Sequence, residues 1–348
     1  MVKFKSRTII ALLLVAAFMF LTACDAVGGG GAAAPAAGDG PTGTITLYTS
    51  MKESKIGDIV RAFNAEYPGI RVEHYSAGAG RLMARIAAER EAGQIQADLI
   101  WTSEVPDFYR MAADEMLHSF IPPARAAGEI MDPLMVPSNY FTPARLGALG
   151  VAYNTNRIDT PPTEWSDLLQ PNWTNGFAIA NPSLSGTALV SVAMLEEYFG
   201  LEFFHDLRAN GGMVGGGSGQ VVDDTAIGEF YGSLAVDYIV FDAMDLGATM
   251  GMAWPREMIV IPSPVAIFRE SENITAAETF LNFLLSPVGQ QIIADNGTTP
   301  VRPGMYMAER FNLPPVEEMM ERAMVIDFVA MADQREAIIT TFLDIMQN

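Results

Sequence analysis

The chain has 348 residues, half of them apolar and 9% aromatic, which is enough for two packed domains. Only 18% of the residues are charged, which argues against intrinsic disorder. The net charge of −20 argues against a nucleic-acid-binding protein, because phosphate backbones need a basic surface. The single cysteine excludes a disulfide framework and a cysteine-cluster metal site.

The N-terminus has the pattern of an export signal. Three basic residues, at positions 3, 5 and 7, precede an apolar run from Ile9 to Leu21. This run is shorter than the roughly 20 residues that a membrane-spanning helix needs. We therefore expect residues 1–23 to be a signal peptide.

The apolar run ends in small residues directly before Cys24. This junction resembles the lipobox of bacterial lipoproteins, which implies cleavage before Cys24 and a lipid on its sulfur. An ordinary signal peptide followed by a chance cysteine is the alternative. Residues 24–43 would then comprise the lipidated cysteine and a flexible linker rich in Gly, Ala and Pro, with the folded body exported and tethered to the cell membrane.

Strand and helix patterns alternate from Thr44 onward. β-type runs are expected at 45–48, 70–75, 97–101, 149–153, 177–180, 234–238 and 265–268. Helical periodicity is expected at 56–63, 82–92, 105–116, 165–171, 187–199 and 275–285, with two more helices between 315 and 346. This alternation predicts an α/β protein with a parallel sheet covered by helices.

Several short segments, in a fixed order, are similar to one family of bacterial proteins. They are Leu47–Ser50, Phe63–Ile70, Ala97–Trp101, Gly150–Thr155, Trp165–Leu168, Asn181–Thr187, Ile227–Glu229 and Phe280–Gln290. Their order and spacing resemble the substrate-binding proteins of ABC importers, in the group that includes ferric-iron, phosphonate, sugar-phosphate and thiamine binders. The likeness covers roughly residues 44–305.

The resemblance implies a periplasmic-binding-protein-like fold of two α/β lobes with a ligand cleft between them. Lobe one would comprise residues 44–148 and 266–348, and lobe two residues 149–265. The two hinge crossings would lie at 147–150 and 263–266, where Gly, Pro and Ser are frequent. Closure around the ligand would then present a composite surface to the permease.

A strand-to-helix turn in the expected second lobe is the clearest candidate ligand site. Ser183, Ser185, Gly186 and Thr187 follow a strand and open a helix. The free N–H groups at a helix N-terminus, with nearby hydroxyls, form a neutral site for an anion such as phosphate or phosphonate. Simple N-capping by serine or threonine is the alternative.

The matching turn in the expected first lobe carries Thr49 and Ser50, followed by Lys52 and Lys55. These are the only two lysines beyond the expected signal peptide. At this spacing they share one helix face and could mark an anion site. A solvated surface pair is the alternative.

Two further segments are candidates because they follow strands or form loops. Ser103 and Glu104 come after the third strand, where ligands bind in α/β folds. Glu104 also fits as a hinge or surface acid. Ser218 and Gly219 belong to a glycine-rich loop whose amides could reach an anion, although a plain connecting loop is equally consistent.

Asp237 and Tyr238 are expected to end a strand and face the cleft. Iron binders of the family use adjacent tyrosines here, whereas this chain has no Tyr-Tyr pair. Its three histidines show no metal-binding spacing. The sequence therefore disfavours ferric iron held by phenolates and implies no resident metal or cofactor.

The leading prediction is a monomeric binding protein that delivers a small anionic solute, such as a phosphonate or sugar phosphate, to a permease and performs no chemistry. A ferric-iron or iron-chelate binder is the alternative within the same family. An exported hydrolase is a remote alternative, since no Gly-x-Ser-x-Gly nucleophile motif is present. A sensor lipoprotein with the same fold is another.

Overall fold

The computed structural model describes residues 40–131, 134 and 137–347. The expected signal peptide, Cys24 and most of the linker therefore lie outside the described residues. Within the described part of the chain, no helix is both long enough and apolar enough to cross a membrane.

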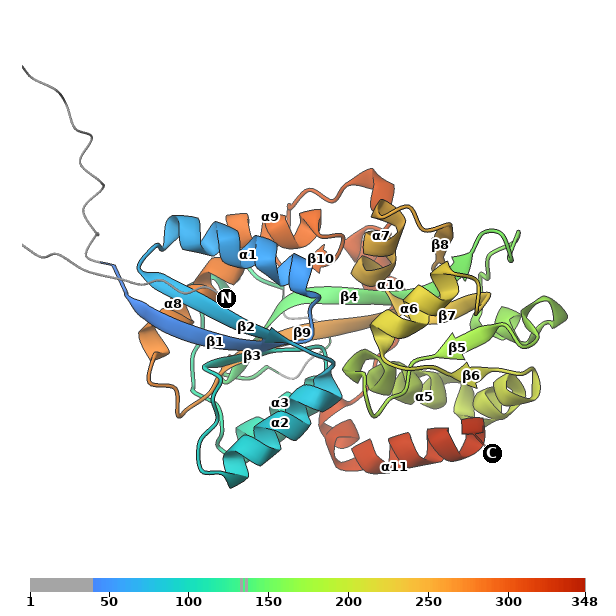
Figure 1. Cartoon of the computed structure of the whole chain (residues 1–348), viewed down its shortest axis with the longest axis horizontal. Helices are drawn as coiled ribbons and strands as arrows, with labels where there is room; N and C mark the ends of the chain where they lie inside the picture. The colour runs from blue at the N-terminus through green and yellow to red at the C-terminus, as the bar shows by residue number, and fades with distance from the viewer. Residues whose placement is uncertain (1–39, 132–133, 135–136, 348) are drawn as a thin grey trace, which may run out of the picture. The chain divides into compact units, whose positions relative to one another are not determined.

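A mixed sheet, ten-stranded over the described residues, runs through the molecule. Its order is β2 (Ile70–Ser76), β1 (Gly43–Thr49), β3 (Leu99–Trp101), β9 (Ile259–Ile267), β4 (Phe141–Asn154), β7 (Gly232–Val236), β5 (Phe177–Ile179) and β6 (Met213–Val214). Two short strands, β8 (Met250–Ala253) and β10 (Thr299–Pro300), pair with β4. Figure 1 shows β4 and β9 side by side in the middle of this arrangement.

The expectation of a parallel sheet is correct only at the two ends of this order. β1 is parallel to β2 and β3, and β5 is parallel to β6 and β7. β4 and β9 are antiparallel to each other and to their outer neighbours β7 and β3. The reason is that the chain crosses the middle of the sheet twice, in opposite directions.

The expected hinge crossings lie inside these two long strands. Residues 147–150 belong to β4 and residues 263–266 to β9, and both segments are buried. Ser263 donates a hydrogen bond to the Thr102 carbonyl and accepts one from Ser103. At the expected crossings the chain therefore lies in paired strands and not in loops, and a hinge at these positions stays a prediction.

Helices cover both faces of the β2–β1–β3 end. α1 (Glu53–Glu66), α8 (Ile274–Leu284) and α9 (Pro287–Asp295) lie on one face, and α2 (Ala79–Glu91) and α3 (Val105–Ala113) on the other (Figure 1). Alternation along β1 explains this: Leu47 packs into the core with Phe63 and Phe280, whereas Tyr48 packs with Leu82 and Phe108.

At the other end of the sheet lie α5 (Gly186–Ala209), α6 (Ser218–Ala226) and α7 (Asp237–Asp245). α7 begins where we expected a strand to end, and α6 begins inside the expected glycine loop. α7 was missed because Asp237 to Phe241 are all buried, so no amphipathic period marks the helix. Short helical turns, α4 (Pro123–Ala126), Trp165–Leu169, Pro171–Trp173 and Glu309–Phe311, complete the chain with α10 (Val316–Arg322) and α11 (Phe328–Gln347).

The C-terminal helix α11 contacts both expected lobes. Phe342 packs edge-on against Phe204 of α5, with ring centroids 5.1 Å apart. Arg335 forms an ion pair with Glu104, directly before α3. α11, which we expected in lobe one, therefore contacts elements of both expected lobes, and the lobe boundaries stay predictions.

Candidate ligand-binding site

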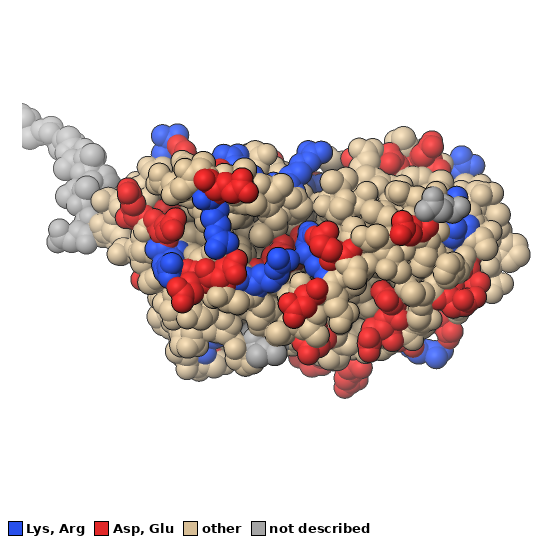
Figure 2. All heavy atoms as spheres, turned by 90° about the horizontal axis from the view of Figure 1, so that it is seen from below, with Lys and Arg blue, Asp and Glu red and all other residues tan. Residues whose placement is uncertain are grey.

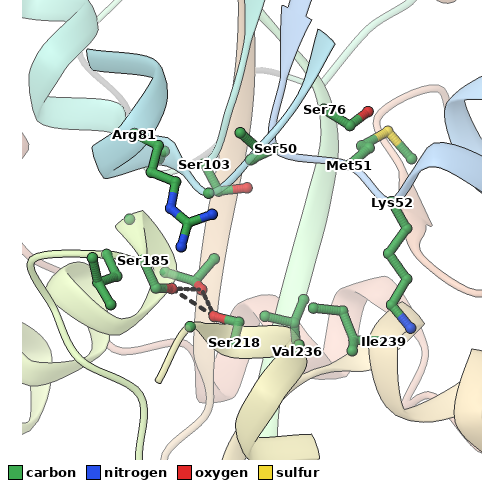
Figure 3. A pocket seen from close by; sticks show the side chains of 18 of the residues that line it. Ser50, Met51, Lys52, Ser76, Arg81, Ser103, Ser185, Ser218, Val236 and Ile239 are labelled. Carbon is green, nitrogen blue, oxygen red and sulfur yellow. Dashed lines mark hydrogen bonds between the residues drawn. The ribbon is translucent and has the colours of Figure 1, made fainter. Parts of the chain in front are cut away.

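A cavity of about 440 Å³ lies where the two halves of the sheet meet (Figure 3). Its lining comes from segments 50–53, 76–79, 184–187 and 217–219, with Arg81, Ser103, Arg145, Val236, Tyr238 and Ile239. These segments follow strand ends, where the edge of an α/β sheet leaves room for a ligand.

Five helices begin at this cavity. The first residues of α1, α2, α5 and α6 line it, as does Tyr238, the second residue of α7. Each N-terminus carries unpaired N–H groups and a partial positive charge. α1, α2 and α6 have no side-chain cap, so their first N–H groups are left for solvent or a ligand. The cavity is therefore electropositive although the chain is strongly acidic.

Three hydroxyl groups form a cluster at the start of α5 and α6. Ser185 Oγ lies 3.0 Å from Thr187 Oγ1 and 2.5 Å from Ser218 Oγ, and the last two are 3.1 Å apart (Figure 3). Ser185 also accepts a hydrogen bond from the backbone N–H of Ala188 at 3.2 Å. Ser185 therefore both caps the N-terminus of α5 and lines the cavity.

Arg81 on α2 extends toward this hydroxyl cluster from the opposite side of the cavity (Figure 3). Among the described residues, no acidic side chain pairs with its guanidinium. Figure 2 shows basic side chains gathered near the middle of one face, with acidic side chains spread around them. An exposed, unpaired guanidinium beside neutral hydroxyls is suited to an anion.

Arg145 of β4 lies buried beneath the cavity, with 1% of its surface exposed. Its guanidinium donates to Thr298 at 3.2 Å and to Ser103 at 3.3 Å, and lies over the Tyr238 ring. Asp237 provides a nearby negative charge: burial raises the pKa of its carboxyl to about 6, and Arg145 opposes that rise. Arg145 Nε has no hydrogen-bond partner within the described residues.

The structure brings most of the candidate ligand residues together. Those that line the cavity are Ser50, Lys52, Ser103, Ser185, Gly186, Thr187, Ser218, Gly219 and Tyr238. They come from five separate segments, which supports the prediction that strand ends and helix starts converge here.

Four candidates do not line the cavity, each for a structural reason. Thr49 is buried in β1 and accepts a hydrogen bond from the Met51 backbone. Asp237 is buried and accepts hydrogen bonds from the backbone N–H groups of Ala148 and Tyr238, since it begins a helix and does not face the cleft. The other two are Ser183, which lines a separate cavity, and Glu104, which is buried against Arg335.

Ser183 bonds to Asn181 and lines a separate cavity beside α2 and α3. Glu104 is 1% exposed and accepts two hydrogen bonds from Arg335, at 2.8 and 3.0 Å. It is therefore neither a surface acid nor a cavity-lining group.

Sequence reasoning missed Ser76, Arg81 and Arg145. Ser76 ends β2 and its buried hydroxyl has no partner among the described residues. An arginine within the otherwise uncharged and mostly apolar run 141–153 was a visible signal for a buried charge that would need polar or charged partners. No comparable signal marks Arg81, which lies on an ordinary polar helix face.

The two lysines at the β1–α1 turn share one partner. Asp242 of α7 lies 3.0 Å from Lys52 Nζ and 3.1 Å from Lys55 Nζ. Tyr238 also donates to the Ser50 carbonyl at 3.4 Å. These contacts join the two sides of the cavity, so the lysines are neither a simple solvated pair nor both free to bind an anion.

The chain is similar to known bacterial solute-binding proteins in sequence and in fold. Residues 113–323 match the sequence profile of a family described as bacterial extracellular solute-binding protein. A putative 2-aminoethylphosphonate-binding periplasmic protein of Salmonella paratyphi A is 25% identical over 238 residues, covering 65% of this chain and 68% of that protein.

Solved structures show the same fold. The periplasmic binding protein AfuA of Actinobacillus pleuropneumoniae, with fructose-6-phosphate bound, has a TM-score of 0.76 at 22% identity, over 87% of this chain and 98% of that chain. Iron-bound HitA of Pseudomonas aeruginosa has a TM-score of 0.73 at 22% identity, over 88% and 99%. The two-lobed fold predicted from the sequence is confirmed, and the chain belongs to the bacterial extracellular solute-binding protein family, whose members bind solutes for ABC importers and are not enzymes.

Proposed function

We propose that this protein captures a small solute carrying a phosphoryl or phosphonyl group and delivers it to the permease of an ABC importer. The observation that carries the proposal is the hydroxyl cluster of Ser185, Thr187 and Ser218 opposite the unpaired Arg81.

The chemistry of this cluster suits a phosphorus oxyanion. Each of the three neutral hydroxyls can donate a hydrogen bond to an oxygen of a tetrahedral phosphoryl or phosphonyl group. The starts of α5 and α6 add backbone N–H groups and positive helix ends at the same place. Arg81 supplies the full charge and a planar, two-pronged donor.

The donor set favours this ligand over ferric iron. Tyr238 is the one phenol that lines the cavity within the described residues, and burial raises its pKa, which opposes formation of the phenolate. Two relatives also support the proposal by their printed descriptions, which concern an aminoethylphosphonate and a sugar phosphate.

The lipobox-like junction at Cys24 supports a proposal for how the protein is held at the cell membrane. We propose that a lipid on Cys24 anchors the protein to the membrane and that the linker holds a monomeric body next to the permease. Mass spectrometry of the membrane-extracted protein, with Cys24→Ala as the comparison, tests the anchor. An unmodified N-terminal peptide that begins elsewhere contradicts it.

Isothermal titration with alkylphosphonates and sugar phosphates tests the ligand class. Replacing Ser185 and Thr187 with alanine should raise the Kd of a bound phosphonate by about tenfold for each hydroxyl lost. Ser183→Ala is the matched control, because Ser183 is a nearby serine that lines a different cavity. Equal affinity of the double variant and the wild type would overturn the proposal.

A further inference from the structure

We infer that the end of the cavity next to Lys52 is a subsite for a second acidic group on the ligand, such as a carboxylate. The inference rests on the proposed function, because it takes the hydroxyl cluster as the place of the phosphoryl or phosphonyl group. Lys52 recognises the second group, and Asp242 is a positioning residue that holds Lys52 in place.

The cavity has two separate cationic ends. Arg81 lies at one side, near the hydroxyl cluster, and Lys52 lies at the other (Figure 3). A volume of about 440 Å³ is far larger than a phosphoryl group, since a water molecule takes about 30 Å³ in the liquid. A ligand that engages Arg81 therefore has room to extend toward Lys52.

The charges around Lys52 leave a net positive end. Lys52 and Lys55 together share the single carboxylate of Asp242. Burial would raise the pKa of Asp242, but the hydrogen bonds and the positive charges of the two lysines together outweigh burial and lower it, so the carboxylate stays ionised. Two ammonium groups against one carboxylate leave one unit of positive charge.

Lys52 lines the cavity, and its ammonium group has N–H donors that Asp242 does not use. An ammonium group has three N–H donors, and Asp242 accepts one from Lys52. The Lys52 side chain is 31% exposed, compared with 15% for Lys55, and only Lys52 lines the cavity. The two lysines thus share a partner but differ in access to a ligand.

Glu53, the one acid that lines the cavity within the described residues, does not cancel this charge. Its side chain is 74% exposed and its carboxylate contacts His74 Nε2 at 2.8 Å, on the solvent side of the turn. An ammonium group on the ligand would face the positive charge of Lys52 at this end of the cavity. The subsite therefore fits an acid and rejects an amine.

Three phosphonates of similar size test the subsite by titration of the purified full chain. They are 3-phosphonopropionate, which carries a carboxylate, propylphosphonate, which is apolar, and 2-aminoethylphosphonate, which carries an ammonium group. The wild type should bind the carboxylate about tenfold more tightly than the apolar compound, and the ammonium compound more weakly than both.

Lys52→Met should abolish the preference for the carboxylate, and Lys52→Arg should restore most of it. Lys55→Met removes a contact to the same Asp242 and should keep the preference, so it separates recognition from the loss of an ion pair. Because the readout is a ratio of two Kd values in one variant, a general loss of stability does not move it.

The outcomes separate this inference from the proposed function. Absence of binding by all three phosphonates contradicts the proposed function, and the subsite with it. Binding without a preference in the wild type, a preference that survives Lys52→Met, or tightest binding of the ammonium compound overturns the subsite alone.

Discussion

Arg335 donates two hydrogen bonds, from Nε and Nη2, to a single carboxylate oxygen of Glu104, at 3.0 and 2.8 Å. The two residues are 231 positions apart and join the C-terminal helix α11 to the segment that enters α3. Asp107 lies on the same side, 3.8 Å from Arg335, and both acids are almost fully buried. Glu104 also lies against Gly186, where an added Cβ would come within 2.9 Å of its carboxylate. The pair therefore connects α11 to the first residue of α5, at the edge of the ligand cavity.

Replacing Arg335 with methionine should lower the free energy of unfolding by about 3–5 kcal/mol, because it leaves two buried acids without their cation. Urea denaturation measures this loss. Arg61→Met removes an exposed ion pair with Asp58 and should change stability by less than about 1 kcal/mol. Similar small effects for both variants would show that Arg335 is not a structural anchor.

The same acids predict a pH dependence of stability. Burial, and then the neighbouring Asp107, raise the pKa of Glu104 from 4.5 to about 8, against the opposing effect of Arg335. The folded protein thus holds a proton that the unfolded chain releases near pH 4.5. The contribution of Glu104 is fully present below that pH and is lost as the pH rises toward 8.

Glu104→Gln keeps the shape and removes the titration, so the free energy of unfolding should fall less steeply between pH 5 and pH 8 than in the wild type. Urea denaturation series across this range supply the slopes, and Glu336→Gln, an exposed partner of Arg335, serves as the control. Parallel slopes for Glu104→Gln and the wild type would assign the pH dependence to another group.

Asp242→Asn should loosen the contact between the two sides of the cavity, because it removes the shared partner of Lys52 and Lys55. We expect a larger radius of gyration in ligand-free small-angle scattering and a several-fold higher Kd for a phosphonate. Asp245→Asn is the matched control, since Asp245 lies on the same helix but pairs with the exposed Arg310. An unchanged radius and Kd would mean that this ion pair does not contribute to closure.

Asp237→Asn tests whether Asp237 stabilises the fold, as its buried position indicates, or contacts the ligand, as the sequence predicted. The substitution leaves the buried Arg145 without a nearby negative charge, which should cost about 3 kcal/mol of stability. At temperatures where the variant stays folded, its Kd for a phosphonate should match the wild type within about threefold, since Asp237 does not line the cavity. A large loss of affinity with unchanged stability would return Asp237 to the list of ligand contacts.

Short-range sequence patterns predicted many of the turns and helix starts of this protein. The turns at Ser50 and Ser185 were predictable because a hydrophobic strand, a small polar turn and a helix start follow one another within a few residues. Five of the nine candidate residues that line the cavity belong to these two turns: Ser50, Lys52, Ser185, Gly186 and Thr187. The antiparallel pairing of β4 and β9 was not predictable from periodicity, because the strand pattern does not show in which direction a neighbour runs.

The sequence by itself determined the α/β class, the family resemblance and the strand-to-helix turns that precede α1 and α5, since each depends on short segments of the chain. Only the tertiary structure decided which charges meet. Arg145 and Asp237, Lys52 and Asp242, and Glu104 and Arg335 are each separated by about 90 or more positions. Whether a buried or half-buried charge binds a ligand or stabilises the fold depends on the partner that packing brings to it, and no local pattern encodes that partner.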